Sequence, residues 1–180
     1  METKRLQLLH ELTPNVAIIA IVVNPKNPQA DEQLQELQAA ARTLGVQPEF
    51  LTASSPKEID AAFASLVERR AGALHMAADA FFNTRRGQFI VLSARHALPT
   101  TFPYREFPAA GGLMSYGPSL EDAYQQAGIY AGRILRGEKP AEMPVQQAVK
   151  VELVINLQTA TTLGLTIPLP LLGRADEVIE

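Results

Sequence analysis

The hydrophobic residues of this chain follow two alternating patterns. Short, continuous apolar runs are typical of strands buried on both faces, and the clearest is residues 16–23, VAIIAIVV. The segment that follows places Leu34, Leu37, Ala41 and Leu44 at helical spacing, which is typical of an amphipathic helix. Both patterns recur along the chain. They predict strands at residues 16–23, 49–53, 72–78, 98–102 and 113–116, with helices at about 28–44, 56–67 and 83–96.

Helix-capping residues stand where this interpretation needs them. Asn27 is a good N-cap before Pro28, and Gly45 can end the same helix. Residues 55–58, SPKE, form a capping box with proline at the first helical position. Repeated strand–helix units predict an α/β fold, a parallel doubly wound sheet covered by helices on both faces, in three layers.

After the fifth strand the alternation changes. Gly117 and Pro118 are expected to end that strand, because a regular strand does not continue through proline. Ser119 then begins a long amphipathic helix. A proline-bearing linker at 138–144 leads to a further strand at 151–156.

The two ends of the chain do not complete the predicted sheet in an obvious way. The helix at 2–12 has no strand before it, and the pieces after Gly117 are too small to be a domain. We therefore predict that residues 14–116 form an α/β domain and that the pieces on either side of it are parts of another lobe, whose main body is not in this sequence.

Composition and charge limit the classes of function that the sequence can support. A hydrophobic fraction of 47%, with 19% charged residues, is typical of a folded globular chain. The net charge of −3 gives no electrostatic reason to expect nucleic acid or an anionic membrane as partner. Because the sequence has no cysteine, disulfides, zinc–thiolate sites and cysteine nucleophiles are excluded. The start of the chain has no apolar signal core, so the chain as written is expected in the cytoplasm.

Candidate ligand residues stand at the carboxyl ends of the predicted strands, where parallel sheets bind ligands. They are Asn24, Asp79, Tyr104, Ser115 and Tyr116. An amino-acid-like ligand needs an acid for its ammonium, donors for its carboxylate and an apolar wall.

Each candidate also has a simpler interpretation. Asp79 could accept a ligand ammonium or could only begin a helix, where the macrodipole favours an acid. Asn24 could bind ligand or only shape an Asn-Pro turn. Tyr116 could stack on a ring or pack at a hinge. The amides near Ser54 and Ser55 could bind an anion, but helix capping is the simpler reading.

No enzymatic reading has support in the sequence. His10, His75 and His96 are scattered without metal-binding spacing, and each is interpreted as a core or capping histidine. There is no nucleophile elbow, P-loop or dinucleotide-binding glycine motif. We predict no catalytic residue, no metal and no cofactor.

Six motifs resemble those of ABC-transporter substrate-binding proteins of the tryptophan/tyrosine-binding type. In chain order they are 4–12 KRLQLLHEL, 21–28 IVVNPKNP, 79–86 DAFFNTRR, 112–117 GLMSYG, 127–140 AGIYAGRILRGEKP and 152–160 ELVINLQTA. The resemblance covers essentially the whole chain. The resemblance implies that 14–116 is the second-lobe, Rossmann-like α/β domain of a type I periplasmic-binding-protein fold and that 1–13 is a remnant helix of the first lobe. Residues 117–180 are then the hinge, followed by a helix, a strand and a tail that belong to the first lobe. Relative to the family, the chain is expected to be truncated at the N-terminus.

The resemblance also implies a function. Such proteins are periplasmic, close two lobes over a small solute, and deliver it to an ABC permease; here the hinge is expected near 115–119. A lone lobe offers half of the contacts to an amino acid or similar solute. The alternatives are a fragment that self-associates through its exposed first-lobe remnants, as a domain-swapped homo-oligomer, and a flavodoxin-like enzyme.

Overall fold

One mixed β-sheet runs through the described part of the protein. The computed structural model describes residues 1–145 and 150–180, apart from the side chain of Val67. Seven strands lie in the order β2-β1-β3-β4-β5-β6-β7. Strands β1 to β5 are parallel, β6 is antiparallel to β5, and β7 is parallel to β6.

The element bounds follow the predicted alternation closely. The strands are β1 Ile18–Val23, β2 Gln47–Thr52, β3 Ala73–Met76, β4 Thr100–Phe102, β5 Met114–Pro118, β6 Val151–Asn156 and β7 Glu177–Ile179. The helices are α1 Glu2–Leu12, α2 Ala30–Leu44, α3 Pro56–Glu68, α4 Ala80–Thr84, α5 Arg86–Arg95, α6 Glu106–Ala109, α7 Leu120–Leu135, α8 Leu157–Thr162 and α9 Leu169–Leu172, with a 3-10 turn, η1, at Pro140–Glu142.

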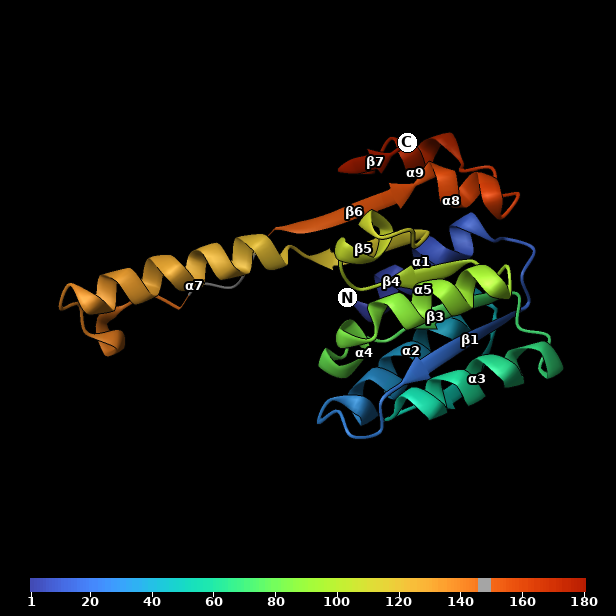
Figure 1. Cartoon of the computed structure of the whole chain (residues 1–180), viewed down its shortest axis with the longest axis horizontal. Helices are drawn as coiled ribbons and strands as arrows, with labels where there is room; N and C mark the ends of the chain where they lie inside the picture. Colours follow the sequence, from blue (N-terminus) through green and yellow to red (C-terminus); the bar gives the residue numbers. More distant parts are fainter. Residues whose placement is uncertain (146–149) are drawn as a thin grey trace.

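Helices cover both faces of the sheet, which confirms the predicted three-layer α/β fold (Figure 1). On one face, Leu6 and Leu9 of α1 and Leu37 of α2 pack on Ile19 and Ile21 of β1. On the other face, α3 to α6 contribute a phenylalanine-rich cluster that includes Phe63, Phe82, Phe89 and Phe107. Because β1 is buried on both faces, its continuous apolar run needs no polar alternation.

Several local predictions are confirmed by the backbone. Gly45 adopts the left-handed conformation, with φ 71°, at the end of α2. The Glu58 amide donates to Ser55 Oγ over 3.3 Å, and the Ser54 amide donates to Glu58 Oε2 over 2.6 Å, as in a capping box. Ser119 accepts a hydrogen bond from the Asp122 amide and begins α7.

Other local predictions are wrong. The segment expected as one helix at 83–96 belongs to two helices: α4 begins at Ala80, where Asp79 is the N-cap, and α5 begins at Arg86. The short helix α6 was not predicted. The fifth strand does not stop before Gly117: β5 pairs with β6 as far as Pro118, which stands at the end of the strand, where proline is tolerated.

Gly117 has a steric reason to be glycine. A Cβ atom added there would lie 1.9 Å from the carbonyl oxygen of Pro103. The backbone that follows β4 therefore passes directly against β5, and only a residue without a side chain fits.

Both ends of the described chain pack on the sheet that β1 to β5 begin. Helix α1 contacts α2, β3, β4 and β5, so it covers the same sheet as residues 14–116. Strands β6 and β7 extend that sheet beyond β5. The sequence did not show this because an antiparallel edge strand reached through a linker leaves no repeat pattern. Residues 146–149 of the predicted segment 117–180 lie outside the described residues.

Among the described helices and strands, α7 and η1 lie outside the body formed by the sheet and its covering helices. Figure 1 shows α7 projecting away from the sheet, beyond the carboxyl ends of β1 to β5. None of its residues is buried, and Tyr124 is 76% exposed. The chain then returns to the sheet at β6.

Candidate functional site

The carboxyl ends of β1 and β3 bring Asn24 and Asp79 into contact. The side-chain amide of Asn24 donates to Asp79 Oδ1 over 3.1 Å, and the Phe82 amide donates to the same oxygen over 3.0 Å. Asp79 is therefore the N-cap of α4. No hydrogen bond within the described residues reaches Asp79 Oδ2. This oxygen can accept from a donor outside the protein while Oδ1 keeps the cap.

The backbone before Asp79 is held from three directions. The Ala78 amide donates to Glu2 Oε1 over 3.1 Å. The Ala78 carbonyl accepts from Asn27 Nδ2 over 3.1 Å and from Gln33 Nε2 over 2.8 Å. Because both polar groups of Ala78 are bonded, the position of Asp79 is set by the fold.

Tyr104 follows β4 and lies half-buried against the phenylalanine-rich cluster. Burial raises the pKa of its hydroxyl; the charge of Arg5 opposes this, and the charges of Glu2 and Asp79 add to it. The phenol therefore stays protonated near neutral pH and lies within electrostatic reach of Asp79. Its ring and hydroxyl can offer a ligand an apolar face and a hydrogen bond.

Ser115 and Tyr116 lie differently from these three residues. Ser115 is only 1% exposed, and its hydroxyl has no hydrogen-bond partner among the described residues. Tyr116 is half-buried against the cluster formed by α1, β5 and β6, and its carbonyl accepts from Arg5 Nη1 over 3.3 Å. In the described part of the chain, no hydrogen bond joins either side chain to Asp79.

The serines at residues 54 and 55 act as helix caps. The amide and hydroxyl of Ser54 both donate to Glu58 Oε2, over 2.6 and 3.0 Å. Glu58 therefore already occupies the position that an anion would take. The capping interpretation is confirmed.

A buried ionic cluster beneath this edge was not singled out from the sequence. Glu2 pairs with Arg5 and lies 2.6 Å from His75 Nε2, measured from Glu2 Oε2. The three residues are 5%, 1% and 0% exposed. Helical spacing could have found two of them, since positions 2 and 5 fall on the face that Leu6, Leu8, Leu9 and Leu12 bury.

The charge states of this cluster follow from its contacts. Burial alone would raise the pKa of Glu2, but His75 and Arg5 hold it well below its usual range. Burial lowers the pKa of His75. His75 is therefore a neutral core histidine that donates from Nε2 to an ionised Glu2.

Metal binding and membrane crossing find no support in the described residues. No group of three or more His, Asp or Glu side chains there could hold a metal ion. No described helix is both long and apolar enough to cross a bilayer.

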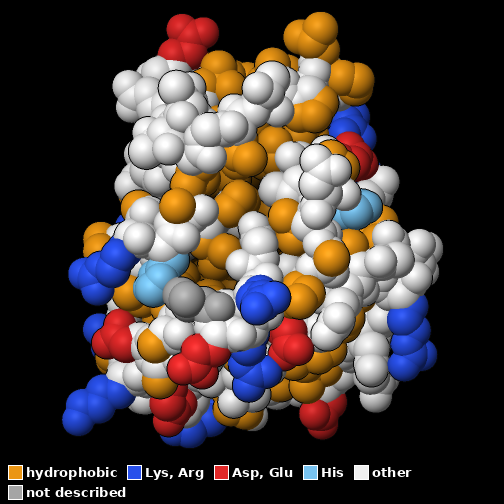
Figure 2. All heavy atoms as spheres, turned by 90° about the vertical axis from the view of Figure 1, so that its right-hand side faces the viewer, with side chains coloured by type: hydrophobic (Ala, Val, Ile, Leu, Met, Phe, Trp, Pro, Cys, Tyr) orange, Lys and Arg blue, Asp and Glu red, His pale blue; other side chains and the backbone are white. Residues whose placement is uncertain are grey.

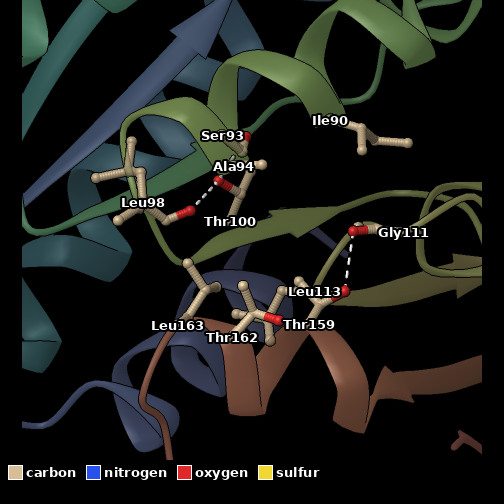
Figure 3. Close-up of a pocket in the computed structure, with 12 residues that line it drawn as sticks. Ile90, Ser93, Ala94, Leu98, Thr100, Gly111, Leu113, Thr159, Thr162 and Leu163 are labelled. Atoms are coloured by element: carbon tan, nitrogen blue, oxygen red, sulfur yellow. Dashed lines mark hydrogen bonds between the residues drawn. The ribbon is translucent and has the colours of Figure 1, made fainter.

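A separate apolar pocket lies at the opposite ends of the strands (Figure 3). It is enclosed by α5, α8 and the segments that enter β4 and β5, and it holds about 430 Å³ including its open mouth. Its threonine hydroxyls donate within the protein: Thr100 to the Leu98 carbonyl, Thr159 to the Gly111 carbonyl and Thr162 to the Gln158 carbonyl. The residues that line the pocket include no carboxylate of the kind that Asp79 offers.

The end of the molecule opposite α7 shows no concentration of one charge. In Figure 2, apolar side chains occupy the upper and central part of this face, and acidic and basic side chains are mixed around its lower half. The distribution fits a chain of net charge −3 and gives no basic surface there for nucleic acid.

Comparison with known proteins identifies the family. A family model described as ABC transporter substrate binding protein matches residues 1–179. The chain belongs to the ABC transporter substrate-binding protein family. A comparison with curated protein sequences gives no match.

Solved structures related to this family member share its fold. A conserved domain protein from Vibrio cholerae has a TM-score of 0.83 and 27% identity, and the match covers 98% of this chain and 60% of that one. The ABC domain from Streptococcus pneumoniae in complex with L-Trp has a TM-score of 0.81 and 25% identity, and covers 99% of this chain and 60% of that one.

A ligand-free, open substrate-binding protein with adhesive properties from Clostridium difficile has a TM-score of 0.70 at 20% identity, over 98% of this chain and 59% of that one. The family member therefore spans about 60% of the length of the first two structures that it matches.

Proposed function

We propose that this chain is the solute-binding part of an ABC importer and holds a small molecule, an amino acid or similar, at the carboxyl ends of β1, β3 and β4. The observation that supports this proposal is that Asp79 Oδ2 has no hydrogen-bond partner among the described residues. This oxygen belongs to a carboxylate whose other oxygen is fixed by Asn24 and Phe82, and no described hydrogen bond uses it. A ligand ammonium is the donor that fits it best, because a charge-assisted hydrogen bond is the strongest kind available here.

The neighbouring side chains complete a site for an amino acid. Asn24 orients the Asp79 carboxylate, and Tyr104 supplies a half-buried ring and a protonated hydroxyl. Tyr116 is assigned to the β5 side of the site as the second ring. Ser115 stands next to it in the strand but is only 1% exposed. The complex of the Streptococcus pneumoniae relative with L-Trp supports an amino acid as the class of solute.

Helix α7 belongs, in this proposal, to the first lobe of a longer protein. Its apolar and polar residues lie on separate faces, yet none of its residues is buried. Gly128 and Gly132 stand within the helix, and nothing lies within 4 Å of a Cβ added at either. Glycine weakens an exposed helix by about 1 kcal/mol relative to alanine, so such glycines are useful where another element approaches closely. The relatives, which are longer by about two-fifths of their length, contain the residues for such an element.

The site would then be closed by two lobes. The chain leaves the sheet after Pro118 and returns at Val151, so these two points form the hinge of the proposed closure. The partner that receives the solute is an ABC permease, and the place of action is the periplasm, as for the family.

A second candidate function rests on the same exposed helix. Two chains that pair through α7, or exchange it, would form a homo-oligomer in place of a two-lobed monomer. Light scattering separates the two cases: a monodisperse monomer at high concentration argues against the oligomer.

Calorimetry tests the proposed function. Because one lobe offers about half of the contacts, we expect isothermal titration with L-tryptophan to show weak or undetectable heat of binding to the 180-residue chain. Tight binding by a monomeric chain would refute the half-site interpretation. Asp79→Asn removes the ammonium acceptor and is expected to abolish whatever binding remains.

A further inference from the structure

The buried pair of Arg5 and Glu2 connects two places that the proposed site needs. Glu2 accepts from the Ala78 amide, next to Asp79, over 3.1 Å. Arg5 pairs with Glu2 and donates from Nη1 to the Tyr116 carbonyl over 3.3 Å. These polar contacts therefore connect the end of β3, through the first turn of α1, to the end of β5.

Helix packing alone does not require these charges. Helix α1 already buries Leu6, Leu8, Leu9 and Leu12 against the sheet. A buried ion pair is seldom more stabilising than apolar residues of the same volume, because both charges lose their water. Its specific effect is geometric: the two charges fix the elements that they join.

We propose that Arg5 and Glu2 are positioning residues of the ligand site, which hold the Ala78–Asp79 segment at a fixed distance from the strand end at Tyr116–Pro118. This inference rests on the proposed function. The strand end is the point where the chain leaves the sheet for α7. The pair therefore ties the acceptor of the ligand ammonium to the hinge of the proposed closure.

Arginine is suited to this task in a way that lysine is not. Its planar guanidinium presents several N–H donors, so one group can pair with Glu2 while another reaches the Tyr116 carbonyl. A lysine ammonium at residue 5 can neutralise Glu2 but is a single point charge on a shorter side chain. Arg5→Lys therefore separates neutralisation of the buried acid from the connection to β5.

Amide hydrogen exchange in the ligand-free chain tests the inference. In Arg5→Lys we expect the melting temperature to stay close to that of the wild type, while exchange at the Gly117 and Ser119 amides rises about tenfold, as for a lost charged hydrogen bond. Exchange at Ala78, whose acceptor Glu2 remains, should not change. Arg69→Lys, at the exposed pair with Glu49, is the matched control and should change none of these amides.

Two outcomes would overturn the positioning role. One is unchanged exchange at Gly117 and Ser119 in Arg5→Lys; the other is an equal rise at every core amide, which would mean lost global stability alone. If Arg5→Lys does not fold, the double variant Glu2→Gln/Arg5→Met can be measured in its place, because it leaves no unpaired buried charge. We expect it to raise exchange at the same two amides.

Addition of L-tryptophan separates this inference from the proposed function. In the wild type, shifts of the Asp79 and Phe82 amide signals report ligand binding at the proposed site. Their absence would refute that site, and the exchange measurement would still decide the role of Arg5. With shifts present, Arg5→Lys should need a several-fold higher L-tryptophan concentration for the half-maximal shift, and Arg69→Lys should not.

Discussion

Helices α2 and α7 have similar amphipathic sequences but differ in how much of each helix is buried. Both separate apolar from polar residues along one face, and both carry acids in the first turn and an arginine in the last. Helix α2 buries five residues, among them Leu37 and Ala41, whereas α7 buries none. The pattern of a helix therefore predicts that it has a buried face, but not whether the partner lies in the same chain.

Because of this difference, the chain has two regions in which substitutions should cost different amounts of stability. The sheet and its covering helices form a closed body with a defined edge at Asp79. Helix α7 projects from this body, and none of its residues is buried. Substitutions in the two regions should therefore differ in their effect on stability.

Truncation of an apolar side chain should cost most in the body. Leu37→Ala removes a fully buried side chain of α2 and is expected to lower the free energy of unfolding by about 3 kcal/mol or more. Ile134→Ala, in α7, removes a side chain that is 42% exposed and should cost less than about 0.5 kcal/mol. Urea unfolding measures both. Similar costs would mean that α7 is packed in solution and that the comparison is wrong.

The glycine at the end of β5 should not tolerate a methyl group. Gly117→Ala would drive a Cβ into the Pro103 carbonyl, so we expect a loss of about 3 kcal/mol, measured by thermal or urea unfolding. A near-neutral Gly117→Ala would show that the backbone after β4 can move away from β5.

Lowering the pH should reduce the free energy of unfolding through protonation of Glu2. Its pKa is held at about 2 in the folded chain, against 4.5 for an ordinary glutamate. The unfolded chain therefore takes up this proton first as pH falls, so the stabilisation is complete above pH 4.5 and is lost between about 4.5 and 2. The loss is on the order of 3 kcal/mol.

The control for this pH effect lies after α7. Glu2→Gln should remove most of the difference in unfolding free energy between neutral and acidic pH. Glu138→Gln, at the exposed pair with Arg133, should leave the pH dependence nearly as in the wild type, because exposed pairs contribute little. Equal effects of the two substitutions would contradict a buried ionic cluster at Glu2.

The smallest expected effect has the opposite sign. Gly128→Ala replaces a helix-weakening glycine of α7 at a position with open space around it. It should stabilise the chain or leave it unchanged, by up to about 1 kcal/mol in chemical denaturation. A clear destabilisation would indicate a close neighbour at Gly128, as in a self-associated chain.

Much of the body was predictable from residue patterns. The continuous apolar run of β1, Gly45 at the end of α2 and the cap at Ser55 are local signals, and the structure confirms them. The antiparallel strand β6 was not recognised as part of the sheet, since strand pairing across a linker is set by packing and not by local sequence. The contact of Asn24 with Asp79 follows from the parallel sheet, which brings strand ends together.

The ionic cluster under the site was less accessible to sequence reasoning. Glu2 and Arg5 look like ordinary surface residues near a chain end, and only their place on the leucine-bearing face of α1 indicates burial. Their partners, His75 and the backbone at Ala78 and Tyr116, are distant in sequence. Long-range polar contacts of this kind leave no periodic signal.

The most direct test of the account is an NMR titration of the isotopically labelled chain with L-tryptophan. We expect weak, saturable shifts centred on the amides of Asp79 and Phe82. They should be lost in Asp79→Asn and retained in Asp31→Asn, which changes an exposed acid of α2. Shifts centred on the apolar pocket at Ile90 and Thr159, or shifts that survive Asp79→Asn unchanged, would contradict a ligand site at Asp79.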